Sequence, residues 1–263
     1  MSDNVNNATF DPSENLWDEI TKLITEKMPN QLLPLIEEVF HKKYPAGTSI
    51  KLLRTEHIVP AMEESRHMKN IFTDITILVQ EKDVYHIECQ MDMDNEIVIR
   101  LIEYDFHIAM THNHFIDKDG IYNLVFPQSV IMYPGTSASI KDTLKCRVIF
   151  PDKSTHEYSV PVVRVQSYNL EQIKEKHLTL FVPFMLIQFQ KRLQSKHSPI
   201  LPNELTDFTK ELIVILNNEV NLGNLNTTQY RDYLKMINMA AVRIFNQAVE
   251  QQKEVLTVTK SIL

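Results

Sequence analysis

Glycine is scarce in this chain and never clusters. A P-loop and a dinucleotide-binding fingerprint both need neighbouring glycines, which let backbone amides approach phosphate groups. The sequence therefore excludes both kinds of nucleotide site. The four glycines among the 263 residues are Gly47, Gly120, Gly135 and Gly223.

Cysteine, long hydrophobic runs and excess positive charge are also missing. Cys89 and Cys146 are too few for a disulfide framework or a cysteine-rich zinc module. No stretch approaches the roughly 18 apolar residues of a membrane span, and the polar, acidic start is unlike a secretory signal. We therefore expect a cytoplasmic protein without a membrane segment. A formal net charge of -7 argues against a pure DNA-binding module, but it allows an enzyme with a local basic cleft and metal-binding carboxylates.

The residues that are present have the composition of a globular protein. Hydrophobic residues make up 43% of the chain and charged residues 23%. The length suits one large domain or a domain with an appendage. We predict a disordered or loosely ordered N-terminus over residues 1–14, a main domain over 15–200 and a helical C-terminal extension over 201–263.

The hydrophobic pattern predicts a mixture of helices and strands. Residues 15–44 have helical spacing, with Pro34 in a first turn where two helices meet. Period-two alternation then predicts three strands, of which the second and third form a hairpin around a short polar turn. These strands cover residues 49–59, 71–79 and 84–90; a helix over 95–113 and a strand over 124–133 follow. Later segments predict strands over 145–150 and 157–165 and helices over 178–193, over 206–219 and from about 228.

The most informative feature is the set Asp74, Glu88 and Gln90 on the predicted hairpin. Opposite residues of an antiparallel pair point to the same side of the sheet, and their numbers have a constant sum. A three-residue loop puts Asp74 opposite Glu88 (sum 162) or opposite Gln90 (sum 164), so all three share one face. An even loop would separate Asp74 from Glu88.

Carboxylates on such buried strands need a partner, because desolvating an unpaired charge costs several kcal/mol. A hard cation such as Mg²⁺ is one partner, since it prefers oxygen ligands. The alternative for Asp74 and Glu88 is a structural pair with Arg or Lys. The alternative for Gln90 is an amide that only satisfies the sheet.

The ordered series of these motifs resembles the PD-(D/E)XK nuclease superfamily, and within it the Rpn-type recombination-promoting nucleases of the transposase class. The resemblance implies an α/β fold with a restriction-endonuclease-like αβββαβ core, in which helices flank a mixed central sheet. It covers roughly residues 32–193 and assigns the nuclease-like domain to 15–200. The motifs that carry it are Thr73-Asp74-Ile75-Thr76-Ile77, His86-Ile87-Glu88-Cys89-Gln90, Arg100-Leu101-Ile102-x-Tyr104 and Val130-Ile131-Met132-Tyr133-Pro134-Gly135.

The resemblance implies a metal-dependent DNA endonuclease of the mobile-element type, with Mg²⁺ or Mn²⁺ as cofactor and DNA as substrate. Asp74 and Glu88 would be metal ligands, and the main-chain carbonyl of Cys89 would reach the metal as well. Gln90 stands where the superfamily usually has Lys. As a neutral amide it can position water, but it supplies no positive charge.

Accessory residues and a second function follow from the same resemblance. Glu37 or Glu38 on the first helix is the candidate third acid. Arg100 and Tyr104 either contact phosphate, orient Glu88 or form a packed helix face. The alternative function is an inactive nuclease-fold protein that binds DNA or a protein partner, as the missing Lys and the acidic balance indicate. The C-terminal helices are a further candidate, as the interface of a homo-oligomer.

Overall fold

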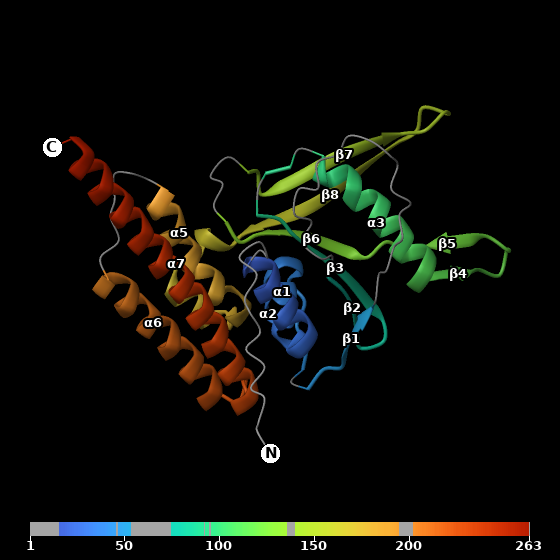
Figure 1. Cartoon of the computed structure of the whole chain (residues 1–263). Coiled ribbons are helices and arrows are strands. Elements are labelled where there is room, and N and C mark those ends of the chain that lie inside the picture. Colours follow the sequence, from blue (N-terminus) through green and yellow to red (C-terminus); the bar gives the residue numbers. More distant parts are fainter. Residues whose placement is uncertain are drawn as a thin grey trace, which may run out of the picture.

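The computed structural model describes residues 16–45, 47–53, 75–91, 93–94, 96–135, 140–194 and 202–262. They form a mixed α/β structure around a six-stranded sheet (Figure 1). The α/β class is therefore confirmed, whereas the predicted N-terminal segment 1–14 lies outside the described residues. The strands of this sheet are β1 (Ile50–Leu53), β2 (Ile75–Val79), β3 (Asp83–Cys89), β6 (Gln128–Tyr133), β7 (Thr143–Ile149) and β8 (Thr155–Arg164).

The remaining elements are helices and one small ribbon. The ribbon consists of β4 (His114–Ile116) and β5 (Tyr122–Leu124). The α-helices are α1 (Leu16–Lys27), α2 (Leu33–Phe40), α3 (Ile97–His112), α4 (Leu170–Glu175), α5 (Ile187–Gln194), α6 (Pro202–Asn221) and α7 (Thr227–Ile262). Short 3-10 turns are η1 (Pro29–Leu32), η2 (Val165–Ser167), η3 (Thr179–Phe181) and η4 (Pro183–Leu186).

The sheet is mixed, with the strand order β1-β2-β3-β6-β8-β7. The first three strands form an antiparallel meander. β6 then runs parallel to β3, β8 runs parallel to β6, and β7 is antiparallel to β8. A parallel neighbour cannot be reached by a tight turn, and α3 with the β4–β5 ribbon forms the crossover from β3 to β6.

The β2–β3 hairpin has the loop length that the sequence predicts. Val79 pairs with Asp83, which leaves a three-residue loop, Gln80–Lys82. Gln80 and Glu81 both have left-handed backbone, with φ of 53° and 55°. Every β2–β3 partner pair has residue numbers that sum to 162, for example Thr76 with His86. This result confirms the hairpin and selects the first of the two predicted registers.

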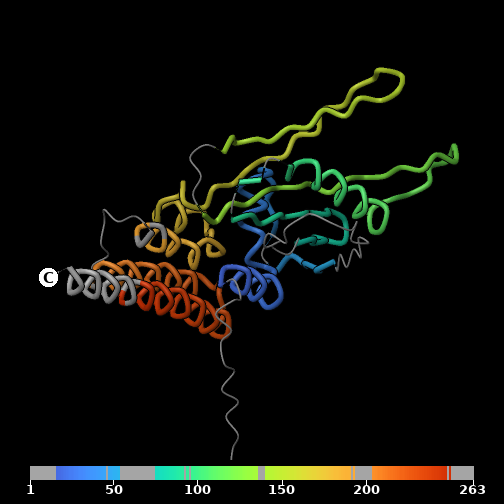
Figure 2. The backbone as a smooth tube through the Cα atoms, turned by 45° about the horizontal axis from the view of Figure 1, so that its top comes forward, coloured from blue at the N-terminus to red at the C-terminus, as the bar shows by residue number. Residues whose placement is uncertain are grey.

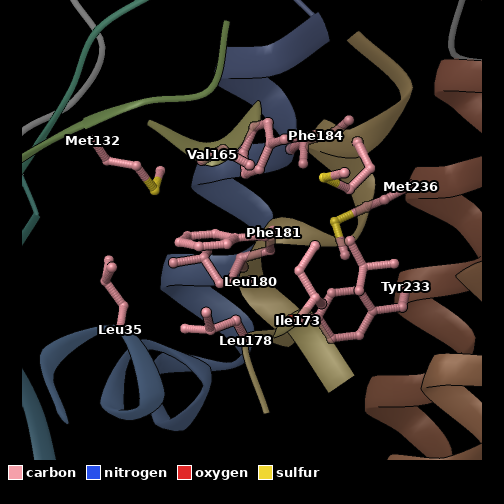
Figure 3. Packing of buried hydrophobic residues seen from close by; sticks show 14 of the residues in the cluster. Leu35, Met132, Val165, Ile173, Leu178, Leu180, Phe181, Phe184, Tyr233 and Met236 are labelled. Atoms are coloured by element: carbon pink, nitrogen blue, oxygen red, sulfur yellow. The ribbon is translucent and has the colours of Figure 1, made fainter. Parts of the chain in front are cut away.

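One face of the sheet packs on the main hydrophobic core. Alternate strand residues such as Ile87 and Met132 are completely buried there. Figure 3 shows Met132 of β6 and Leu35 of α2 close to Phe181, with Tyr233 of α7 on the far side of the cluster. Fully burying one such side chain contributes about 1.5–3 kcal/mol, so this face accounts for much of the fold's stability.

The C-terminal helices belong to the same core. α6 and α7 lie side by side in Figures 1 and 2, and Leu212, Leu216 and Ile237 are buried members of the main cluster. The helical character predicted for 201–263 is therefore correct over the described residues. The domain boundary near residue 200 stays a prediction.

Two prolines explain where the observed elements differ from the predicted ones. The sequence predicts one strand over 124–133, but β5 ends at Leu124 and β6 begins at Gln128, directly after Pro127. The sequence also predicts one helix over 178–193. Instead, two 3-10 turns precede α5, and the second begins at Pro183. Proline removes a backbone N–H and clashes with the preceding turn of an α-helix, so it breaks regular elements.

Candidate functional site

The predicted hairpin site falls partly within the described residues. Asp74 lies outside them. Glu88 and Gln90 lie at the end of β3, on the face of the sheet that α3 covers. On this face, Ile97 and Leu101 of α3 pack against Ile131 and other apolar side chains of a second, smaller hydrophobic cluster. Glu88 therefore points into a covered layer rather than into bulk solvent.

The Glu88 carboxylate is completely buried and is surrounded by polar groups. The Gln90 amide nitrogen donates to Glu88 Oε1 at 2.5 Å. Nη2 of Arg100 lies 3.8 Å from the same oxygen, and Nη1 donates to Asp94 Oδ2 at 2.5 Å. Hydrogen bonds and a nearby positive charge offset the desolvation of a buried carboxylate. The structure thus brings Glu88, Gln90 and Arg100 together.

A buried carboxylate on α3 forms the centre of a second group of contacts. Asp105 is completely buried and is hydrogen-bonded by residues from three strands. The ring nitrogen Nδ1 of His86 in β3 lies 2.7 Å from Asp105 Oδ1. Ser129 of β6 and Tyr158 of β8 donate to Asp105 Oδ2 at 2.6 and 2.5 Å. Burial and the Asp105 charge raise the pKa of the Tyr158 hydroxyl above its usual value, which keeps it a donor.

His86 connects the two groups. Its second ring nitrogen, Nε2, lies 4.0 Å from Glu88 Oε2. The Tyr104 ring stands edge-on to the His86 ring, with 6.2 Å between the ring centroids. The predicted accessory residue Tyr104 therefore packs against His86 at the edge of the site. His86 is thus hydrogen-bonded to Asp105 on one side and lies 4.0 Å from Glu88 on the other.

Two other predicted residues have different surroundings. Glu37 accepts hydrogen bonds from the Tyr44 backbone and from Lys43, and its alternative, Glu38, contacts Tyr168 and Lys176. Both acids of α2 therefore stabilise loops. The Cys89 thiol faces the main core, and burial raises its pKa well above the usual range. The predicted role of the Cys89 main-chain carbonyl stays a prediction.

A first-helix acid that the sequence analysis did not select is Asp18 of α1. Burial raises the pKa of Asp18 to about 6, and its Oδ1 has no hydrogen-bond partner among the described residues. One turn later in α1, the Thr21 hydroxyl lies 4.0 Å from the Cys89 sulfur. The charges of Glu88 and Asp18 both raise the pKa of Cys89, in addition to the effect of burial. The start of α1 thus places a second acid near the end of β3.

Negative charges gather near the end of β3. Burial, followed by the charge of Asp94 and then that of Glu88, raises the pKa of the Tyr133 hydroxyl to about 12. The described residues include no group of three His, Cys, Asp or Glu side chains that could hold a metal ion. Glu88 fits a metal as one buried carboxylate ligand. A complete ligand set needs an acid beyond the described group.

Asp105 and His86 left a signal in the sequence. Ile97, Leu101 and Ile108 form an apolar stripe on α3, and Asp105 stands within this stripe at helical spacing. A single carboxylate in an apolar stripe predicts a buried polar contact. His86 belongs to the same period-two series as Glu88 and Gln90. Ser129 and Tyr158 lie in strands that the sequence cannot pair with β3, so nothing local identifies them.

Among the described residues, no helix has the length and apolar character needed to cross a membrane. A scan against protein-family models, a search of curated proteins and a search of solved structures each gave no match.

Proposed function

We propose that this chain is a metal-dependent DNA endonuclease of the recombination type, with Asp74 and Glu88 as its metal ligands. The observation that supports the proposal most is the β2–β3 register, whose partner pairs sum to 162. The proposal extends this register by one residue, to Asp74 opposite Glu88. The element order of helices, three antiparallel strands, α3 and a strand parallel to β3 agrees with the αβββαβ order of the restriction-endonuclease-like core.

Each described residue of the site has a defined task in this proposal. A bound Mg²⁺ or Mn²⁺ ion would stabilise negative charge on the phosphate and make water a better nucleophile. Gln90 fixes the orientation of the Glu88 carboxylate through its amide nitrogen, and its carbonyl oxygen is suited to accept a hydrogen bond from water. Arg100, whose side chain is 26% exposed, would contact a DNA phosphate and replace the positive charge of the absent Lys. Asp18 is the first-helix acid of the site.

A plasmid-cleavage assay with the full chain tests the proposal. We expect cleavage of supercoiled DNA with Mg²⁺ or Mn²⁺ and no cleavage after EDTA is added. Asp74→Ala should lower the rate on the order of 100-fold or more, because losing even an outer partner of a metal site costs about 10–100-fold. Glu81→Gln is the matched control, since this exposed acid lies in the loop of the same hairpin. Equal rates for wild type and Asp74→Ala would refute the metal site.

A second function is supported by the position of the Gln90 amide. Its nitrogen is bonded to Glu88 and it supplies no charge, so a chain that binds DNA without cutting it is the alternative. Such a chain would bind a labelled duplex in EDTA, with an affinity that falls steeply as salt rises, because phosphate contacts release counterions. Binding that does not depend on salt would argue against a DNA-binding role.

A further inference from the structure

The hydroxyl of Tyr133 is a buried polar group that the described residues leave without an acceptor. Tyr133 is the last residue of β6 and is 1% exposed. Within the part of the chain that the structure describes, its hydroxyl oxygen is buried and has no hydrogen-bond partner. Burying a hydroxyl without a hydrogen bond costs free energy, so such a group in a native protein calls for an explanation.

The strand register places Tyr133 beside the acid at the end of β3. β6 runs parallel to β3, and Glu88 pairs with Ile131. Residues two apart in a strand share a face, so Tyr133 lies on the same face as Glu88. Next to it, the Gln90 backbone amide donates to the Met132 carbonyl at 2.9 Å, which continues the pairing towards the end of β6. In open α/β sheets, ligands bind at the carboxyl ends of parallel strands.

The electrostatics of the Tyr133 hydroxyl show which groups surround it. After burial, the influences on its pKa are, in order, the charge of Asp94, the Asp94 backbone amide, and the charges of Glu88 and Arg100. The Asp94 amide lowers the pKa, as a donor does, and an amide N–H cannot accept the hydroxyl proton. Neither neighbouring carboxylate accepts that proton in the structure. The side chains of Arg100 and Asp94 are 26% and 32% exposed, so this polar group extends to the surface.

A phosphate oxygen of DNA is the acceptor that the proposed function would bring to this position. In that function, the phosphate would lie between the metal ligand Glu88 and the guanidinium of Arg100. A hydroxyl donor aimed at the nonbridging oxygens stabilises their negative charge. Donation to the attacking water would instead make that water a weaker nucleophile.

We propose that Tyr133 is a substrate-binding residue whose hydroxyl donates to a nonbridging oxygen of the phosphate that is cleaved. This role rests on the proposed nuclease function, and it adds a neutral donor from β6 to the charged groups of β3 and α3.

Removal of the hydroxyl alone, in Tyr133→Phe, tests this role in the full chain. The rate of plasmid cleavage with Mg²⁺ at saturating DNA should fall on the order of 100-fold, a loss typical of removing one donor to a developing oxyanion. The KM for DNA should change little, because the bond is strongest in the transition state. Since the hydroxyl has no acceptor among the described residues, the midpoint of urea unfolding should not fall below that of the wild type.

Tyr233→Phe is the matched control for the chemical change itself. The Tyr233 hydroxyl is also buried and also lacks a hydrogen-bond partner among the described residues. Tyr233 lies on α7 in the main hydrophobic core, rather than on the α3 face of the sheet. Tyr233→Phe should therefore cleave DNA at the wild-type rate.

Three results would overturn the role of Tyr133 and leave the nuclease proposal standing. The first is cleavage by Tyr133→Phe at the wild-type rate. The second is a urea midpoint for Tyr133→Phe well below that of the wild type, which would assign the hydroxyl an internal acceptor. The third is an equal loss of cleavage in Tyr233→Phe. A wild type that does not cleave DNA would instead refute the proposed function, and the role of Tyr133 with it.

Discussion

The two faces of the central sheet differ sharply, although the same strands build both. On the α1 and α2 face, Tyr85, Ile87 and Met132 are buried in an almost purely apolar core. On the α3 face, their neighbours His86 and Glu88 are equally buried but polar. Apolar burial explains the first face without reference to function, whereas the second face needs a specific partner for each group. The difference makes the α3 face the part of the sheet whose stability depends on specific polar contacts.

Among substitutions that compare the two faces, the largest loss of stability is expected at Asp105. Asp105→Ala leaves His86, Ser129 and Tyr158 without their shared acceptor in a buried layer. Removing one partner of a buried ionic group costs about 3–5 kcal/mol. We expect the free energy of unfolding, measured by urea titration, to fall by about that amount.

Two controls show whether this cost is specific to the polar face. Glu103→Ala changes an exposed acid on the same helix and should stay within about 0.5 kcal/mol of wild type. Met132→Leu, a volume-conserving change on the apolar face, should cost less than about 1.5 kcal/mol. If Asp105→Ala is as mild as Met132→Leu, the two faces do not differ in the way we describe.

A smaller effect is expected at Tyr158, and it depends on pH. The pKa of Tyr158 is raised in the folded state by burial and by Asp105, while the unfolded value is about 10. The stabilising contribution of the protonated hydroxyl is therefore complete below about pH 10 and is lost as pH rises towards the folded pKa. At neutral pH, Tyr158→Phe should lower the free energy of unfolding by about 1.5–3 kcal/mol, because the lost bond is to a charged group.

Above about pH 10, the difference in the free energy of unfolding between wild type and Tyr158→Phe should become smaller. Urea titrations of both proteins across this range measure it. Tyr122→Phe, on the exposed β4–β5 ribbon, is the control, and its free energy of unfolding should equal that of the wild type. If the difference between wild type and Tyr158→Phe is the same at all pH values, the Tyr158 proton does not have the stabilising role described.

The smallest expected effect is a difference in reactivity between the two thiols, which leaves the stability of the fold unchanged. Cys89 is completely buried on the apolar face, while Cys146 of β7 is half-buried. Burial raises the pKa of Cys89, so the reactive thiolate is scarce as well as inaccessible. In the native protein, we expect Ellman's reagent to modify Cys146 and to reach Cys89 only after unfolding. Equal rates of modification of both thiols in the native protein would show that the reagent reaches the apolar face.

The sequence predicted much of the α3 face, but only where its groups are close along the chain. Period two placed Glu88 and Gln90 on one face, and the predicted three-residue loop left two β2–β3 registers, of which the structure shows the one with sum 162. The polar cluster around Asp105 depends on the order of β3, β6 and β8, which no local pattern encodes. Asp18 was missed for a similar reason, because its proximity to β3 results from how α1 packs against the sheet.

Asp105 also has a consequence for the order in which the chain can mature. Its hydrogen-bond partners precede it by 19 residues at His86 and follow it by 24 and 53 residues at Ser129 and Tyr158. Domains form from the N-terminus as the polypeptide leaves the ribosome, so a nascent chain that ends before Tyr158 lacks one of the three hydrogen-bond partners of Asp105. The full set of hydrogen bonds around Asp105 can therefore form only after β8 has been synthesised.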